Sequence, residues 1–96
     1  MVRIKWLPDA LEDFQRLYDF LYSKDTDAAA RAASDILQAS HILKTSPRIG
    51  RPMTESENRE LFIAFGAGAY VIRYRLEDKN AVVVIRVWHS KENRTT

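Results

Sequence analysis

The sequence predicts an α+β fold: an N-terminal strand, an αα-hairpin, and then a three-stranded antiparallel meander, with the helices packed on one face of the sheet. Three observations predict this order. Apolar and basic residues alternate over the first positions, apolar residues recur every three or four positions to about residue 45, and strand-like apolar runs fill residues 60–89. A chain of 96 residues has the length of one domain, and we expect residues 1–96 to form it.

The first strand is expected at residues 2–7, VRIKWL, with Arg3 and Lys5 on its polar side. Pro8 then suits the first turn of a helix that runs to about residue 23. Negative charge near the start of this helix complements its dipole and comes from Asp9, Glu12 and Asp13. The apolar stripe of this helix is Leu11, Phe14, Leu17, Tyr18 and Leu21.

A second helix is expected over about residues 26–45, after a polar turn in which Asp25 or Thr26 can accept the first free backbone N–H groups. Its apolar stripe begins with small alanines, so the two helices can approach closely as an αα-hairpin. The stripe comprises Ala29, Ala33, Ile36, Ser40 and Leu43.

The C-terminal half alternates between breakers and strand-like runs. Residues 46–59 contain two prolines and a glycine without apolar periodicity, which predicts a loop. The runs ELFIAF, AYVIRYRL and AVVVIRVWH predict three strands, separated by a turn at residues 66–68 and a four-residue loop at residues 77–80.

The last two strands decide which side chains share a face of the sheet. With a four-residue loop, Leu76 pairs with Ala81. One face is then wholly apolar, and we expect the helices to cover its residues: Tyr70, Ile72, Tyr74, Val83, Ile85 and Val87. The other face stays uncovered and carries Val71, Arg73, Arg75, Val84, Arg86 and Trp88.

Such a mixed face is suited to a bound protein segment with apolar anchors and acidic groups, because each arginine can hold a carboxylate with two parallel hydrogen bonds. The alternative is an ordinary solvated sheet face whose arginines oppose aggregation. The pattern leaves both interpretations open.

Composition narrows the class of protein. The absence of cysteine excludes disulfides and zinc–thiolate sites and fits a reducing, cytoplasmic environment. Charges interrupt the N-terminus too often for a signal peptide or a membrane span. Residues 1–43 hold five basic and seven acidic side chains, whereas residues 44–96 hold ten basic and six acidic ones. A basic C-terminal half is typical of proteins that bind nucleic acid or acidic protein segments.

Four short motifs carry a family resemblance: PRIGR at 47–51, REL at 59–61, YVIRY at 70–74 and VIRVWH at 84–89. In this order and spacing the chain resembles the RelE/ParE toxins of bacterial toxin–antitoxin pairs, and the loop and the terminal histidine look most like the ParE branch. The resemblance implies a small toxin held inactive by a cognate antitoxin whose C-terminal segment wraps it. It also implies a choice of target, since RelE-like members cut mRNA on the ribosome and ParE-like members block DNA gyrase.

RNA cleavage requires groups that transfer protons and cations that hold the phosphate. His89, Arg73 and Arg86 are the candidates here. Nuclease members that the chain resembles carry an arginine where this chain has Val71, and often an aromatic residue where it has Ser90. Arginine is always protonated and makes a poor base, so we expect no dedicated catalytic site.

We therefore assign antitoxin binding to the uncovered face. Target binding is assigned to the cations of the loop and the tail, which are Arg48, Arg51, Arg59, Lys91 and Arg94. No cofactor or metal site is expected, because His41 and His89 are too few and too far apart in sequence. Direct sequence-specific DNA binding by this chain alone is not expected either.

Three functions remain open: a ParE-like toxin that acts by binding a target such as gyrase, a RelE-like ribosome-dependent endoribonuclease, and a small binding module of the same architecture without toxicity. We expect no aromatic stacking position other than Trp88 on the uncovered face, which weakens the version of this module that would bind single-stranded nucleic acid.

Overall fold

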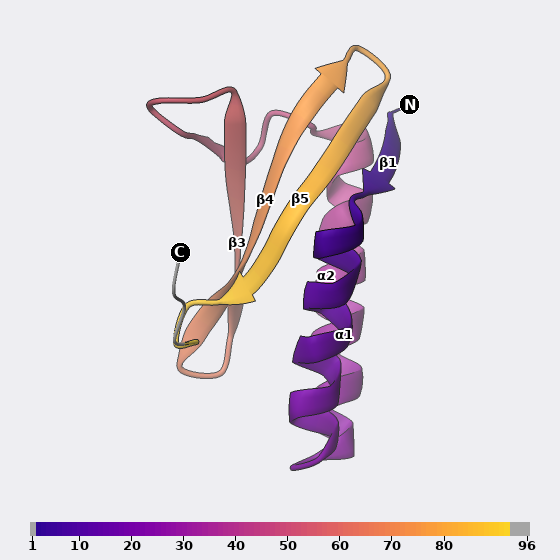
Figure 1. The fold of residues 1–96 in the computed structure, drawn as a ribbon, viewed down its shortest axis with the longest axis vertical. Helices are drawn as coiled ribbons and strands as arrows, with labels where there is room; N and C mark the ends of the chain where they lie inside the picture. Colours follow the sequence, from indigo (N-terminus) through magenta and orange to yellow (C-terminus); the bar gives the residue numbers. More distant parts are fainter. Residues whose placement is uncertain (1, 93–96) are drawn as a thin grey trace.

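The structure is a computed structural model that describes residues 2–92. Two antiparallel helices form one layer and a twisted sheet forms the other (Figure 1). The elements in chain order are β1 (Arg3–Trp6), α1 (Pro8–Tyr22), α2 (Thr26–Thr45), β2 (Arg51–Pro52), β3 (Asn58–Phe65), β4 (Gly68–Asp78) and β5 (Ala81–His89). The predicted α+β fold is confirmed, with both helices on one face of the sheet.

The sheet joins the two ends of the chain. Its strand order is β1-β5-β4-β3-β2, so the N-terminal strand pairs in parallel with the C-terminal one, while β3, β4 and β5 form the predicted antiparallel meander. Part of the predicted loop is the short edge strand β2, which pairs with the start of β3. Gly66 takes φ +63° between β3 and β4, which explains a glycine at this predicted turn.

The bounds of both helices agree with the prediction to within about one residue, because a proline marks the start of α1 and a polar cap marks the start of α2. Pro8 occupies the first turn of α1. At the start of α2, the Asp25 carboxylate accepts hydrogen bonds from the backbone N–H groups of Asp27 and Ala28 at 3.0 and 3.1 Å. Asp25 is therefore the cap, and not Thr26.

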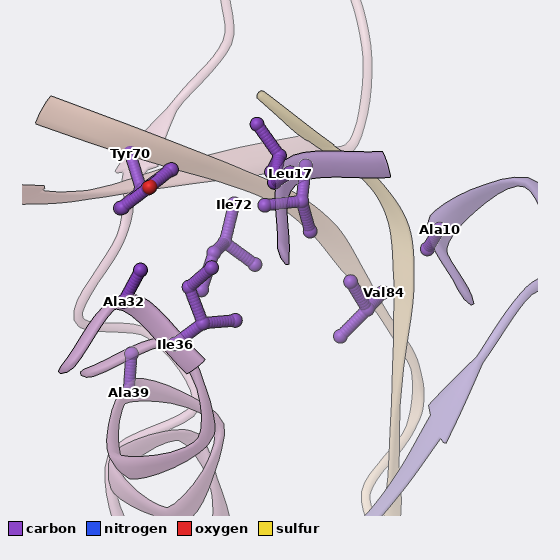
Figure 2. Packing of buried hydrophobic residues seen from close by; sticks show 9 residues of the cluster. Ala10, Leu17, Ala32, Ile36, Ala39, Tyr70, Ile72 and Val84 are labelled. Carbon is purple, nitrogen blue, oxygen red and sulfur yellow. The ribbon is translucent and has the colours of Figure 1, made fainter. Parts of the chain in front are cut away.

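The core lies between the sheet and the facing sides of α1 and α2 (Figure 2). Small residues allow the close approach of the helices, and Ile36 and Leu17 pack against Ile72 and Val84 of the sheet. One predicted core residue is wrong: Leu11 is 56 % exposed, and the neighbouring Ala10 is buried in its place.

The predicted strand register is also wrong. β4 continues to Asp78, which lies opposite Ala81, so the connection to β5 is shorter than four residues. Arg73 lies opposite Arg86 and Tyr74 opposite Val84, which leaves Ile85 as an extra residue in a β-bulge. Because a bulge changes the alternation of faces, Val84 belongs to the core and Ile85 is only half-buried.

Candidate functional site

The sheet face away from the helices, here called the open face, is organised around Arg73 of β4. Its guanidinium donates two hydrogen bonds to Glu60 Oε2 on β3, from Nε at 3.0 Å and from Nη2 at 2.7 Å. The same guanidinium lies 4.8 Å from the ring centroid of Trp88 on β5. Arg73 is thus oriented by one carboxylate and one aromatic ring, and part of its surface remains accessible.

Arg86, opposite Arg73 in the register, reaches across the edge of β5 to α1. Its Nε and Nη2 donate hydrogen bonds to the two carboxylate oxygens of Asp13, at 2.7 and 3.1 Å. The backbone N–H of Val87 donates to Asp13 Oδ2 at 2.9 Å, and Arg16 donates to Oδ1 at 3.1 Å. Asp13 therefore satisfies a backbone donor of β5 beyond the end of β1 and holds Arg86 in place.

Asp13 is the main residue that sequence reasoning misplaced, since its charge had been explained by the helix dipole. It is only 4 % exposed. Burial alone raises the pKa of Asp13, but the hydrogen bonds from Arg86, Val87 and Arg16 outweigh burial, so the pKa lies below its usual value. The available signal was its spacing, because Ala10, Asp13 and Leu17 fall on one buried stripe of α1.

The rest of the predicted antitoxin-binding set is only partly on the open face. Val84 is a correction, because it is fully buried against the helices. Val71 lies opposite Trp88 but is itself buried, whereas Arg75 is half-buried. Phe62 of β3 was missed: it is 46 % exposed, and the guanidinium of Arg51 lies 5.0 Å from its ring centroid.

Hydrogen bonds from the sheet to backbone groups hold the PRIGR segment, residues 47–51, in place. The Tyr74 hydroxyl donates to Pro47 O and accepts from Gly50 N, each at 2.8 Å. Burial raises the pKa of Tyr74, although the Gly50 hydrogen bond and the Arg59 charge act in the opposite direction. A Cβ at Gly50 would lie 2.6 Å from this hydroxyl, which explains the glycine of the motif.

The predicted target-binding cations do not form one cluster. Arg59 Nη1 donates to the carbonyls of Arg48 and Gly50 at 3.0 and 2.8 Å, so its guanidinium holds the loop. Arg48 and Arg51 are exposed near this loop, whereas Lys91 follows β5 and lines a cavity together with Gly66 and Ala67 of the β3–β4 turn, at the far end of β3 from the loop. Arg94 lies outside the described residues.

His89 lies on the helix side of the sheet, opposite to the face that carries Arg73 and Arg86. It pairs with Tyr70 in the register, and its ring meets the Tyr70 ring edge-on at 5.0 Å. The backbone N–H of Lys91 lies 3.1 Å from Nδ1 and Phe65 O lies 3.0 Å from Nε2. Since an N–H only donates and a carbonyl only accepts, Nδ1 is the acceptor and Nε2 the donor in this pair of hydrogen bonds.

A cavity of about 620 Å³ opens beside His89, between α1, the β3–β4 turn and the turn that follows β5. Its apolar walls include Leu17, Phe20 and Leu21 of α1 and Phe65 and Tyr70 of the sheet. Arg16 and Glu92, which form an ion pair, lie at its margin.

Within residues 2–92, no group of three histidine, aspartate or glutamate side chains is arranged to hold a metal ion. Neither α1 nor α2 is long and apolar enough to cross a membrane.

Comparison with known proteins gives a family for this arrangement. Residues 4–94 match the family described as the ParE toxin of the type II toxin–antitoxin system parDE. Toxin RelE1 of Caulobacter vibrioides is 42 % identical over 85 residues, covering 88 % of this chain and 89 % of the relative. Toxin RelE3 of the same organism is 37 % identical over 87 residues, covering 91 % and 92 %.

Two solved structures share the fold. The chromosomal ParDE system from P. aeruginosa aligns with a TM-score of 0.74 at 22 % identity, covering 93 % of this chain and 96 % of that one. The intact E. coli RelBE toxin–antitoxin complex aligns with a TM-score of 0.65 at 16 % identity, covering 96 % and 100 %. The order of elements, the fastened PRIGR loop and these matches lead to one conclusion: the chain belongs to the ParE toxin family and is a RelE/ParE-type toxin of a type II toxin–antitoxin system.

Proposed function

We propose that this toxin arrests growth by binding a target protein, of the kind represented by DNA gyrase, and that it does not cleave RNA. One observation carries the proposal. His89, the best candidate for proton transfer, has both ring nitrogens in hydrogen bonds to backbone groups, and it lies on the other side of the sheet from Arg73 and Arg86. A phosphate held by the two arginines would not reach the histidine.

The arginines themselves are poor substitutes for an acid–base pair. Asp13 raises the pKa of Arg86 further above its usual value, mainly through the hydrogen bond, so Arg86 stays cationic. Binding inhibition needs no proton transfer, since a ligand that prefers one conformation of an enzyme can hold it there.

A cognate antitoxin is the second partner in this proposal, and the open face is its binding surface. Arg75 and the exposed parts of Arg73 and Arg86 present N–H donors there, next to the carboxylates of Glu60 and Asp13 that already pair with Arg73 and Arg86. Trp88 and Phe62 supply apolar area. The ParDE and RelBE structures that share the fold are toxin–antitoxin systems, which supports an antitoxin partner for this chain as well.

A ribosome-dependent endoribonuclease is the second candidate function. It is favoured by the names of two relatives, Toxin RelE1 and Toxin RelE3, which are 42 % and 37 % identical to this chain. Two parallel assays on purified toxin freed of antitoxin separate the candidates: gyrase supercoiling, and primer extension on mRNA in a translating extract. We expect loss of supercoiling and intact mRNA. New mRNA ends with unaffected supercoiling would replace the proposal with the nuclease.

A further inference from the structure

The strand β3 has no neighbouring strand along most of its outer side. β2 pairs only with Arg59 and Glu60, whereas β3 continues to Phe65. β3 lies at the other end of the sheet from β1, and no strand within residues 2–92 pairs with residues 61–65 on that outer side (Figure 1). These residues, here called the free edge, are bounded by β2 at one end and by the turn at Gly66 at the other.

Phe62 and Ala64 direct their backbone N–H and C=O groups outward from the free edge. The carbonyl of Asn58 accepts a backbone hydrogen bond at 3.0 Å on the side of β2, and every second residue after it points the same way. The partner of Ala64 agrees with this direction. Ala69 donates to Ser90 Oγ at 2.9 Å and accepts from Ser90 N–H at 2.7 Å, so it points away from β3. The free edge therefore offers backbone donors and acceptors without a strand partner.

The free edge lacks the charges that protect the opposite edge of the sheet. No charged side chain occurs in residues 61–70, and Phe62 is exposed. At the other edge, Arg3 and Lys5 are exposed on β1, and the Asp13 carboxylate occupies a backbone donor of β5 beyond β1. Such groups on an edge strand oppose pairing with another chain, so their absence from the free edge indicates that it accepts a strand.

The length and register of the free edge match a second copy of itself. Each hydrogen-bonded pair in an antiparallel ladder needs outward-directed groups on both strands. Phe62 opposite Ala64 of the second copy meets this condition twice, once from each side of a two-fold axis at Ile63. On the open face, a large side chain then lies beside a small one. Gly66 of the second copy falls opposite Glu60, so the added strand turns away where β2 begins.

We infer that β3 pairs antiparallel with β3 of a second copy of this chain, about a two-fold axis at Ile63, so that two toxins share one continuous sheet. The inference does not depend on which target the toxin binds. The two-fold contact uses the free edge of both copies, so the assembly stops at a dimer. Only one short strand from each copy takes part, which buries less surface than a standard interface, and the dimer dissociates on dilution.

A single cysteine tests the register, because the chain has no cysteine of its own. Opposite residues of a non-hydrogen-bonded pair have Cα atoms about 4.5 Å apart, a distance that a disulfide spans. Ile63→Cys should therefore cross-link into a dimer under mild oxidation. Phe62→Cys is the matched control, because its counterpart lies diagonally across the ladder at about 8 Å, which is too far for a disulfide.

Sedimentation velocity of the full chain freed of antitoxin measures the association without a cross-link. Over a series from about 5 to about 500 µM, we expect monomers at the low end and dimers at the high end, as for other small interfaces. Ala64→Lys places a charge beside the strand of the other copy at an exposed position, and it should raise the dissociation constant at least about tenfold. Leu11→Lys, on an exposed position of α1, should associate as the parent does.

A parent that stays monomeric at every concentration would overturn the inference, and a parent dimer that Ala64→Lys leaves intact would do the same. Cross-linking of Phe62→Cys in place of Ile63→Cys would reject the two-fold axis. If the parent is monomeric and Ala64→Lys lowers the affinity for the cognate antitoxin, the free edge belongs to the antitoxin and the inference fails. The melting temperature of each variant shows that it is folded, and Ala64→Lys decides the matter should Ile63→Cys not fold.

Discussion

The Asp13 carboxylate of α1 accepts hydrogen bonds from the Arg86 guanidinium and from the Val87 backbone N–H, and so it ties the first helix to the last strand. β1 pairs only with Ala81 to Val84 and then turns into α1. Asp13 takes over as hydrogen-bond acceptor where β1 stops, so a buried carboxylate completes the edge of the sheet.

Asp13→Asn should destabilise the fold by roughly 1 to 3 kcal/mol, because an amide offers one acceptor oxygen where the carboxylate accepts from both Arg86 and the Val87 backbone N–H. Urea unfolding followed by circular dichroism measures this loss. Asp9→Asn, at an exposed position in the first turn of the same helix, is the control and should cost less than about 1 kcal/mol.

The same carboxylate predicts a dependence of stability on pH. The folded pKa of Asp13 lies below its usual value of 3.8, so its contribution is fully present above about pH 5 and is lost as the pH falls through the folded pKa. The parent should therefore lose stability more steeply than Asp13→Asn between about pH 5 and pH 3. If the free energy of unfolding fell equally with pH in both proteins, the hydrogen bonds to Asp13 would not lower its pKa in the folded state.

Val84→Ala should cost about 2 kcal/mol, since it opens space in the core beside Ile72 and Leu17. Ile85→Ala should cost less, although it removes more atoms, because Ile85 is the half-buried bulge residue. Thermal unfolding of both variants gives the order. If Ile85→Ala lowered the stability more than Val84→Ala, Ile85 would have to face the core, as in a register without a bulge.

The different burial of Val84 and Ile85 illustrates which features of the fold could be predicted from the sequence and which could not. Caps, breakers and apolar periodicity are local, and they located α1, α2 and the meander. A bulge at Ile85 is not local, since it depends on how β5 fits β4 and the helices at once, and alternation alone cannot reveal it. The same holds for Asp13, whose partners on β5, Arg86 and Val87, lie more than seventy residues away in the chain.

Gly50→Ala should loosen the PRIGR loop, because the new Cβ would lie 2.6 Å from the Tyr74 hydroxyl. We expect a loss of about 1 to 3 kcal/mol, as for other overpacked sites. Hydrogen exchange should show faster exchange of the Gly50 N–H, with the centre of α2 as the internal control. Unchanged protection at Gly50 would show that the loop does not depend on this contact.

Arg73→Ala combined with Arg86→Ala should weaken antitoxin binding by on the order of 2 kcal/mol in a calorimetric titration, because two oriented guanidinium groups leave the open face. Arg48→Ala, an exposed cation in the loop, is the control and should bind as the parent does. Unchanged affinity of the folded double variant would reject the open face as the antitoxin surface.

The central claim is that growth arrest needs no proton transfer at His89, and the toxicity of His89→Gln tests it most directly. The glutamine amide can still donate to Phe65 O, as Nε2 of the histidine does, but it cannot act as an acid or base. We predict arrest within about threefold of the parent, the effect of one weakened hydrogen bond, and no new mRNA ends for either protein. The claim would be contradicted if a folded His89→Gln variant no longer arrested growth and mRNA ends made by the parent vanished with it.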